Sequence, residues 1–407
     1  MSGCADITLG RGEMSPGSRG FSLVELIVVM GIFLTVMLIS SAAFKIIANS
    51  SSQQSKSVET QIEGIVGLEV LRADLQQAGF GLPWTFQNPI TSTSYVESVM
   101  GSNMPQAGFW PAGDPSTNFN DAPAGIPRAI LSSNTNFNID AANNGSKYIV
   151  IKSTTAATND TSKKWTNVSF VAGVKGVKTW GDPSRDFAAG DRVIVVKNNL
   201  ITTPPSRQLM VTPTGNYFAP FSNYSTTLMT NHLDGDTYQI YGVGTGNLQM
   251  PFNRADYYIM TPATNMPQGC APHTGVLYKV NISHSSGGQA PLGGIPLLDC
   301  VADMQIVYGL DTMNSGSVNF HTVTAPATAD LQRAQIKELR VYILAQDGKQ
   351  DTSFKYPSQT VDVGESFDGG ATITGKRFDL LALIGTGWQN YRWKVYTIVV
   401  RPLNLIQ

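Results

Sequence analysis

The feature that most limits how this chain can fold is an apolar stretch near its N-terminus, RGFSLVELIVVMGIFLTVMLISSAAF, at residues 19–44. From Leu26 to Phe44 it contains no charged residue. At about 1.5 Å of rise per residue, a helix of this length spans roughly the 30 Å hydrocarbon core of a bilayer. A helix that is apolar on every side needs lipid or other apolar helices around it. The sequence therefore predicts a transmembrane helix over residues 21–44.

Glu25 is the residue that a plain membrane anchor does not explain. A carboxylate at the centre of a spanning helix costs about 2.5–3.5 kcal/mol on insertion scales. One interpretation is a secretory signal peptide that is cleaved at the small residues Ser41-Ala42-Ala43. A second is a signal anchor in which Ser22 and Glu25 form a capping box, with Glu25 also complementing the positive end of the helix.

A third interpretation rests on the hexapeptide GFSLVE at residues 20–25. This segment resembles the processing site of type IV prepilins and pseudopilins. The resemblance implies that a membrane peptidase cleaves between Gly20 and Phe21 and methylates the new N-terminal amine of Phe21. It also implies that Glu25, the fifth residue of the mature chain, meets the N-terminal amine of a neighbouring subunit during assembly. Such a cation makes a buried carboxylate tolerable.

The resemblance makes residues 1–20 a leader, whose true start is either Met1 or Met14. Of the three cysteines, Cys4 belongs to this leader, which leaves Cys270 and Cys300 in the mature chain. In an oxidising compartment an even number of cysteines predicts one disulfide, with two free, buried thiols as the alternative.

Composition favours an exported protein of β type. The net charge is −1 and only 14% of residues are charged, against the usual ~25%. This argues against general nucleic-acid binding. The 39 glycines and 22 prolines, with many Ser, Thr and Asn residues, indicate a loop-rich domain.

The long helix is predicted to continue beyond the apolar stretch. Apolar residues recur at steps of three and four, at Val58, Ile62, Ile65, Leu68, Leu71 and Leu75. Gly79 as the C′ residue and Pro83 beyond it mark the end, which gives a helix over 21–79. Gly31, Gly64 and Gly67 each weaken this helix by roughly 1 kcal/mol relative to alanine. Either close packing or local melting when helices bundle explains them.

Residues 84–144 are loop-like and rich in Pro, Gly, Asn, Ser and Thr. After them, short runs that are apolar or alternating predict strands. These runs are 148–152, 168–171, 191–197, 208–212, 237–241, 257–261, 275–282, 304–310, 336–345 and 393–401, with a short helix at 329–333. The predicted fold class is α+β, with a long N-terminal helix packed on a mixed or antiparallel, β-rich domain at 80–407.

Six further segments resemble the PilW type of minor pilin. They are LRADLQQAGFG (71–81), AGDRVIVV (189–196) with the later RQLMVT, DMQIVYGLD (303–311), IKELRVYIL (336–344) and RWKVYTIVVRPLNL (392–405). The last segment differs from that type, which usually carries Arg-Asn near its end, because Pro402-Leu403 separates Arg401 from Asn404.

No constellation of catalytic residues is present in the sequence. The four histidines, His232, His273, His284 and His321, show neither zinc-ligand nor HExxH spacing, and no nucleophile elbow or phosphate loop occurs. The glycine-rich run at 242–246 and Asp234-Gly235-Asp236 are interpreted as turns, with calcium binding the alternative for the second. The clusters at 163–165 and 392–394 pair cations with tryptophan and are interpreted as solvated faces rather than DNA sites.

The sequence therefore predicts a protein that is not an enzyme and needs no cofactor, metal, nucleic acid or small-molecule substrate. The resemblance implies a minor pilin that primes, assembles or caps a type IV pilus. Its expected partners are the prepilin peptidase/methylase, other minor and major pilins, and inner-membrane lipid. We expect a single-pass protein of the bacterial inner membrane with a periplasmic C-terminal domain, located in the pilus after assembly. The alternatives are a type II secretion pseudopilin, a signal-anchored surface adhesin or binding protein, and an exported enzyme released by cleavage near Ala43.

Overall fold

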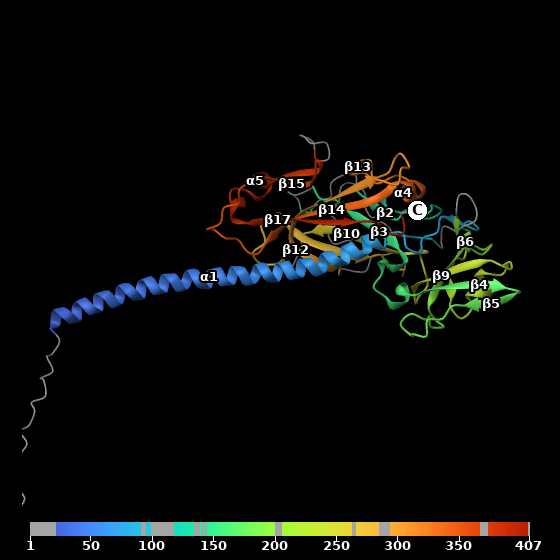
Figure 1. Ribbon diagram of the computed structural model, residues 1–407, viewed down its shortest axis with the longest axis horizontal. Helices are drawn as coiled ribbons and strands as arrows, with labels where there is room; N and C mark the ends of the chain where they lie inside the picture. The colour runs from blue at the N-terminus through green and yellow to red at the C-terminus, as the bar shows by residue number, and fades with distance from the viewer. Residues whose placement is uncertain are drawn as a thin grey trace, which may run out of the picture. The chain divides into compact units, whose positions relative to one another are not determined.

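The computed structural model describes residues 22–90, 95–98, 118–133, 139–140, 142, 145–199, 206–262, 266–284, 294–366 and 373–405. The chain divides into two compact units, Met1–Ser55 and Lys56–Gln407. One helix, α1 (Leu23–Gln76), passes through both (Figure 1).

The first part of α1 is apolar on all sides, so no single face of it is distinguished as the one to bury. Its large hydrophobic residues between Leu23 and Ile47 are 53–75% exposed. The second part is one-sided, since Leu68, Leu71 and Leu75 are buried while Val58, Ile65 and Val66 stay exposed. The side chain of Ile62, part of the predicted stripe, lies outside the described residues.

The helix ends at Gln76, three residues before the predicted end. The N–H of Gly79 donates to the carbonyl of Lys152 at 3.0 Å and not to a helix carbonyl. Gly79 takes φ +83°, the left-handed conformation that glycine adopts at little cost. The chain therefore leaves the helix early because this turn is bonded to a strand.

The smaller sheet runs in the order β1-β7-β6-β9-β4-β5 within the described residues, with β8 paired to β6. Its strands are β1 (Thr85–Phe86), β4 (Trp165–Val171), β5 (Val174–Val177), β6 (Arg192–Asn199), β7 (Ser206–Leu209), β8 (Ala219–Pro220) and β9 (Thr237–Gly244). β1 pairs with β7 in parallel, and the other described pairs are antiparallel, so this sheet is mixed.

The larger sheet is antiparallel and runs in the order β17-β14-β12-β11-β10-β3-β2, with β13 paired to β12, over the part of the chain that the structure describes. Its strands are β2 (Ile130–Ser132), β3 (Ile149–Ser153), β10 (Asn253–Met260), β11 (Gly275–Asn281), β12 (Ile295–Leu310), β13 (Phe320–Thr322), β14 (Ile336–Asp347) and β17 (Arg392–Val400).

The remaining elements are short. They are the hairpin β15 (Thr360–Glu365) and β16 (Thr374–Asp379), the helices α3 (Tyr224–Leu228), α4 (Ala329–Gln335) and α5 (Leu380–Ile384), and the 3-10 turns η1 (Thr154–Ala156), η2 (Asp160–Lys163) and η3 (Trp388–Asn390).

One large core joins α1 to both sheets. Leu71 and Leu75 share it with Ile194 of the smaller sheet and Ile306 of the larger one. On the opposite face of the larger sheet, a second core packs Tyr342 and Trp393 against the β15–β16 hairpin and α5 (Figure 1). The predicted α+β class, a long N-terminal helix followed by a β-rich domain of mixed and antiparallel sheets, is confirmed.

All ten predicted strands overlap a strand of the structure, and the predicted helix at 329–333 is α4. The turn predicted at 242–246 is wrong for its first three residues, which are the end of β9. Gly242 is needed there because a Cβ would overlap the carbonyl oxygen of Thr161 in η2. The alternating apolar and polar pattern of the sequence did not predict β5 or the β15–β16 hairpin. The first three residues of β5 are all exposed.

Candidate processing and assembly site

The start of α1 forms the capping box that the sequence predicts. The N–H of Ser22 donates to Oε2 of Glu25 at 2.9 Å, and Oγ of Ser22 accepts from the N–H of Glu25 at 3.3 Å. The two residues thus satisfy two backbone donors that a helix start leaves unpaired. Gly20 and Phe21, the residues of the predicted cleavage and methylation, lie outside the described residues.

The cap uses only part of the Glu25 carboxylate. Within the described residues, Oε1 of Glu25 accepts no hydrogen bond and meets no cation. The side chain is exposed. One oxygen therefore remains available to a donor from outside the chain.

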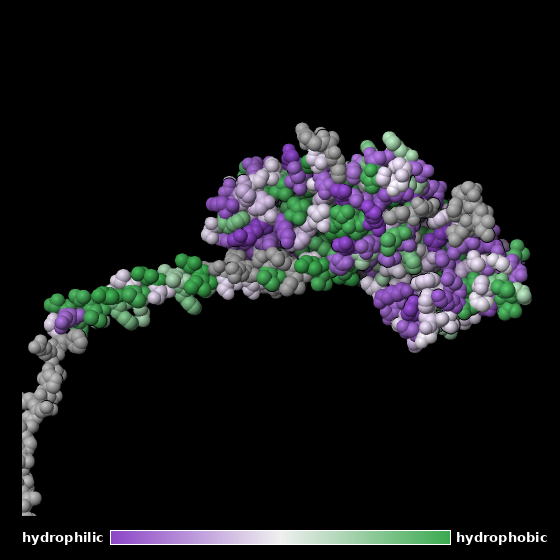
Figure 2. Space-filling model, in the orientation of Figure 1, coloured by the Kyte–Doolittle hydropathy of each residue, from purple (hydrophilic) through white to green (hydrophobic). Residues whose placement is uncertain are grey.

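Behind this cap lies the apolar surface of a candidate membrane span, Leu23–Ala48. Its 26 residues extend about 39 Å along the helix axis. Figure 2 shows this part of α1 as predominantly hydrophobic. An apolar surface of this size is stable only when lipid or other apolar helices cover it.

The second part of α1 contacts the larger sheet at two glycines. A Cβ at Gly64 would lie 3.1 Å from Cδ1 of Leu298, and one at Gly67 would overlap the backbone carbonyl of Leu297. Both neighbours belong to β12. Close packing therefore accounts for these two glycines, whereas Gly31 has nothing within 4 Å of its Cβ position.

A polar contact fixes the same part of the helix. Oδ2 of Asp74 accepts from the hydroxyl of Tyr257 at 2.5 Å and pairs with Nζ of Lys279 at 2.5 Å. Burial raises the pKa of Asp74, and the charge of Lys279 opposes that rise. The carboxylate thus ties α1 to β10 and β11.

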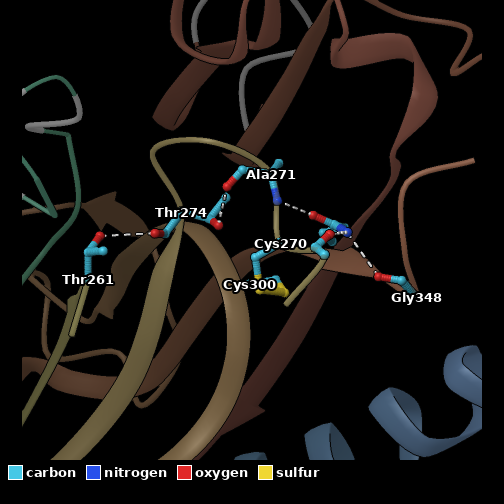
Figure 3. Close-up of a disulfide and its surroundings, with 8 residues drawn as sticks. Thr261, Cys270, Ala271, Thr274, Cys300 and Gly348 are labelled. Carbon is cyan, nitrogen blue, oxygen red and sulfur yellow. Dashed lines mark hydrogen bonds between the residues drawn. A yellow bond between two sulfur atoms is a disulfide. The ribbon is translucent and has the colours of Figure 1, made fainter. Parts of the chain in front are cut away.

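Cys270 and Cys300 are joined by a disulfide with a Cα–Cα distance of 5.0 Å (Figure 3). The loop that carries Cys270 is fastened to β14 by Gln346. Its Oε1 accepts from the N–H of Ala271 at 2.6 Å, and its Nε2 donates to the carbonyls of Gly269 and Gly348. The disulfide joins residues 30 positions apart in the sequence. It attaches the loop that carries Cys270 to β12 of the larger sheet.

A buried cluster of charges was not predicted from the sequence. Nζ of Lys152 lies 2.7 Å from Oε2 of Glu97 and 2.6 Å from Oδ2 of Asp121, and Nε of Arg254 lies 2.7 Å from Oδ1 of Asp256. Burial opposes the charge of Glu97, but Lys152 and Arg254 hold its pKa below the ordinary value. The sequence did contain one indication of this cluster, because Lys152, Arg254 and Asp256 are charged residues within otherwise apolar strands.

This cluster is structural. Glu97 also accepts from the backbone N–H groups of Asp121 and Ala122, so it fastens the segments around residues 97 and 121 to β3 and β10. All of its carboxylates are paired with cations, as a buried charge requires.

The acidic turn and the two basic clusters noted in the sequence lie within the described part of the chain. Asp234 and Gly235 form a turn, and no group of three or more His, Cys, Asp or Glu residues suited to a metal occurs among the described residues. Three of the four cations in the basic clusters pair with carboxylates, and Lys394 lies over the ring of Tyr396. Lys163 bonds Asp160, Lys164 bonds Asp191, and Arg392 bonds Asp351.

Three of the four histidines are likewise held within the fold. His232 stacks on Phe170, His273 pairs with Asp140, and His284 contacts Asn253 at 2.9 Å. Burial lowers the pKa of His284 to about 4.

Comparison with protein families finds a match to the prokaryotic N-terminal methylation motif at residues 16–41. It covers the predicted cleavage position, Glu25 and most of the apolar stretch. No curated protein and no solved structure matches the chain.

Proposed function

We propose that this chain, which carries the prepilin-type methylation motif, is a minor pilin that primes, assembles or caps a type IV pilus. The motif and the single apolar helix behind it support a type IV pilin-like or pseudopilin-like protein anchored in the inner membrane. A protein of this kind is a structural subunit and the substrate of a prepilin peptidase, and it associates with other pilins.

The observation that carries the proposal is the carboxylate of Glu25 in the first turn of an exposed apolar helix. Its Oε2 accepts the capping hydrogen bond, and among the described residues its Oε1 has no partner. A carboxylate at the centre of a spanning helix costs about 2.5–3.5 kcal/mol, which is the upper limit for Glu25 in the first turn of α1. A unit positive charge 4 Å away returns about 4 kcal/mol at an effective dielectric constant of 20. Cleavage after Gly20 would free such a charge at Phe21, and a neighbouring subunit would bring it to Glu25.

In this proposal residues 1–20 are the removed leader, residues 21–44 span the bilayer within a helix over 21–79, and residues 80–407 lie in the periplasm. The disulfide between Cys270 and Cys300 is in keeping with an oxidising compartment.

The arrangement of three strands supports the minor-pilin assignment. The segments at 303–311, 336–344 and 392–405, which resemble the PilW type, fall on β12, β14 and β17. These strands are neighbours in the sheet, in the order β17-β14-β12. Three of the segments that carry the resemblance therefore lie side by side in one sheet.

The decisive test of processing is intact mass together with N-terminal sequencing of the membrane-extracted protein. We expect a chain that begins at Phe21 and carries one added methyl group. A chain that begins at Met1 or Met14, or downstream of Phe44, would refute the proposal.

The test of assembly is Glu25→Ala. We expect the variant to remain in the membrane but to enter filaments about tenfold less, since losing ~1.4 kcal/mol of pairing changes an equilibrium by that factor. Glu69→Ala is the matched control, because Glu69 is an exposed glutamate on the same helix. Incorporation of Glu25→Ala at the wild-type level would show that the carboxylate has no pairing role.

The same motif also suits a type II secretion pseudopilin. Deletion of the gene distinguishes the two machines, since loss of surface pili supports the pilus assignment and loss of secreted enzymes with pili intact contradicts it.

A further inference from the structure

The smaller sheet carries a hollow of about 480 Å³ on one of its faces. Its floor is formed by β4, β5, β6 and β9, and the polar side chains at its surface include Asn167, Ser169, Asn198 and Gln239. This volume lies within the range of about 300–1,000 Å³ that is usual for small-molecule sites.

Strand register arranges these side chains as a grid. Asn167 is paired with Gln239, and Ser169 with Thr237, on the antiparallel strands β4 and β9. Directly opposed residues stand about 4.5–5.5 Å apart, and alternate residues along a strand about 7 Å apart on the same face. Ser169 is also paired with Gly176 of β5, which has no side chain and leaves the floor open.

The grid has hydrogen-bonding capacity that the fold does not use. Within the described residues, the side chains of Asn167, Ser169 and Thr237 make no hydrogen bond. Oδ1 of Asn198 is buried and accepts none. Buried polar atoms are normally paired, so a bound ligand or solvent is needed to satisfy this acceptor.

The charge of the lining narrows the class of ligand. No carboxylate lines the hollow, which disfavours a metal ion, and Lys178 is its single charged side chain, which disfavours a polyanion. Amide side chains offer a donor and an acceptor side by side, and hydroxyl side chains offer both on one atom. This matches a ligand that bears neighbouring hydroxyl groups.

Two tryptophans lie beside Lys178 but outside the lining of the hollow. The rings of Trp165 and Trp180 lie 5.2 Å apart, and Nζ of Lys178 stands 4.1 Å from the centroid of Trp180. Arg185 lies 3.9 Å from the same centroid, so two cations already cover the ring of Trp180, and the proposed site rests on the polar side chains of the grid.

We propose that this hollow binds a neutral saccharide. Asn167 would donate to and accept from adjacent sugar hydroxyls, and Nε2 of Gln239 would donate to a third, since Oε1 of Gln239 already accepts from the hydroxyl of Tyr241 and from Nη2 of Arg207. The proposal does not depend on the pilin assignment, since it rests on the smaller sheet alone.

The test is binding of the full-length protein, held in a zwitterionic detergent without a sugar headgroup, to an array of neutral saccharides. The array includes maltose, cellobiose and oligomers of N-acetylglucosamine, and calorimetry on the strongest ligand gives Kd. We expect Asn167→Ala to raise Kd about tenfold through the loss of two hydrogen bonds. Asn231→Ala, an exposed asparagine outside the hollow, is the matched control.

A second pair of variants tests the place of binding. Gly176→Tyr fills the hollow, and its Cβ would make only ordinary contacts, the nearest 3.5 Å from Oγ of Ser169. Lys175→Tyr is its control, because Lys175 points to the opposite face, where its Nζ lies over the ring of Tyr224. We expect the first variant to abolish binding and the second to retain it.

Three outcomes would overturn the proposal. These are an array without a bound saccharide, a Gly176→Tyr variant with correct folding that binds as tightly as the wild type, and displacement of the saccharide by a peptide or an oligonucleotide of unrelated sequence. Unchanged thermal unfolding of each variant shows that the fold is intact.

Discussion

Gly67→Ala is expected to loosen α1 from the larger sheet. The added Cβ would overlap the carbonyl oxygen of Leu297 and lie 2.6 Å from its carbonyl carbon and 2.8 Å from its Cα. These atoms belong to the backbone of β12, and no rotamer change moves them away. The helix or the strand must shift to make room.

Two opposing effects set the size of the change. Alanine in place of glycine strengthens a helix by up to about 1 kcal/mol. Overpacking typically costs about 1–3 kcal/mol, and a fixed backbone neighbour belongs at the upper end of that range. Displacement of the helix would also disturb the buried Leu68 and Leu71. We therefore expect a net loss of about 1–2 kcal/mol in the free energy of unfolding.

The measurement is urea unfolding of the full chain in detergent micelles, followed by tryptophan fluorescence. All six tryptophans lie beyond residue 83 and thus outside the helix. The control is Gly31→Ala on the same helix, where the Cβ meets nothing within 4 Å, and we expect its unfolding midpoint to equal or slightly exceed that of the wild type. A Gly67→Ala variant as stable as the wild type, or more stable, would refute close packing and favour local melting of the helix.

Three more predictions concern the β domain. Lys152→Met should lower the free energy of unfolding by about 3–5 kcal/mol, because Glu97 then stays buried without its nearest cation; a loss below about 1 kcal/mol in the same urea titration would contradict a buried ion pair. Burial raises the pKa of Asp303 to about 6, from 3.8 in the unfolded chain, so the folded state holds the extra proton and stability should fall as pH rises through this interval. Asp303→Asn should remove that fall and raise stability at pH 7 by up to about 3 kcal/mol, a result that thermal unfolding at pH 4 and pH 7 checks. Replacement of Cys270 and Cys300 by alanine should cost about 3–4 kcal/mol by loop-closure entropy, whereas thiol labelling of both cysteines in the unreduced, denatured wild type would show that no bridge is present.

Local patterns in the sequence were enough for most of the β domain. Alternating or continuous apolar runs located all ten expected strands, because a strand that faces a core must place apolar residues toward it. The hairpin β15–β16 has few fully buried residues, and the sequence therefore carries only a weak alternating pattern there. The prediction of a turn at Gly242 was wrong because the sequence does not distinguish two kinds of glycine. A glycine that allows η2 to approach a strand closely looks the same in the sequence as a glycine in a turn.

The sequence by itself determined the properties that depend on neighbours along the chain. These are the apolar helix, the capping box of Ser22 and Glu25, and the prepilin-type motif. Each is set by residues within a few helical turns, so spacing along the chain is sufficient to predict it.

Tertiary structure alone decided the properties that join distant segments. Glu97 meets Lys152 and Arg254 only after the larger sheet has formed, and Gly67 meets Leu297 only after the helix has packed on that sheet. The polar grid of Asn167 and Gln239 likewise exists only in one strand register, since a shift of one residue would turn those side chains to the opposite face. No local pattern records which strands become neighbours, because pairing is selected by the packing of the whole core.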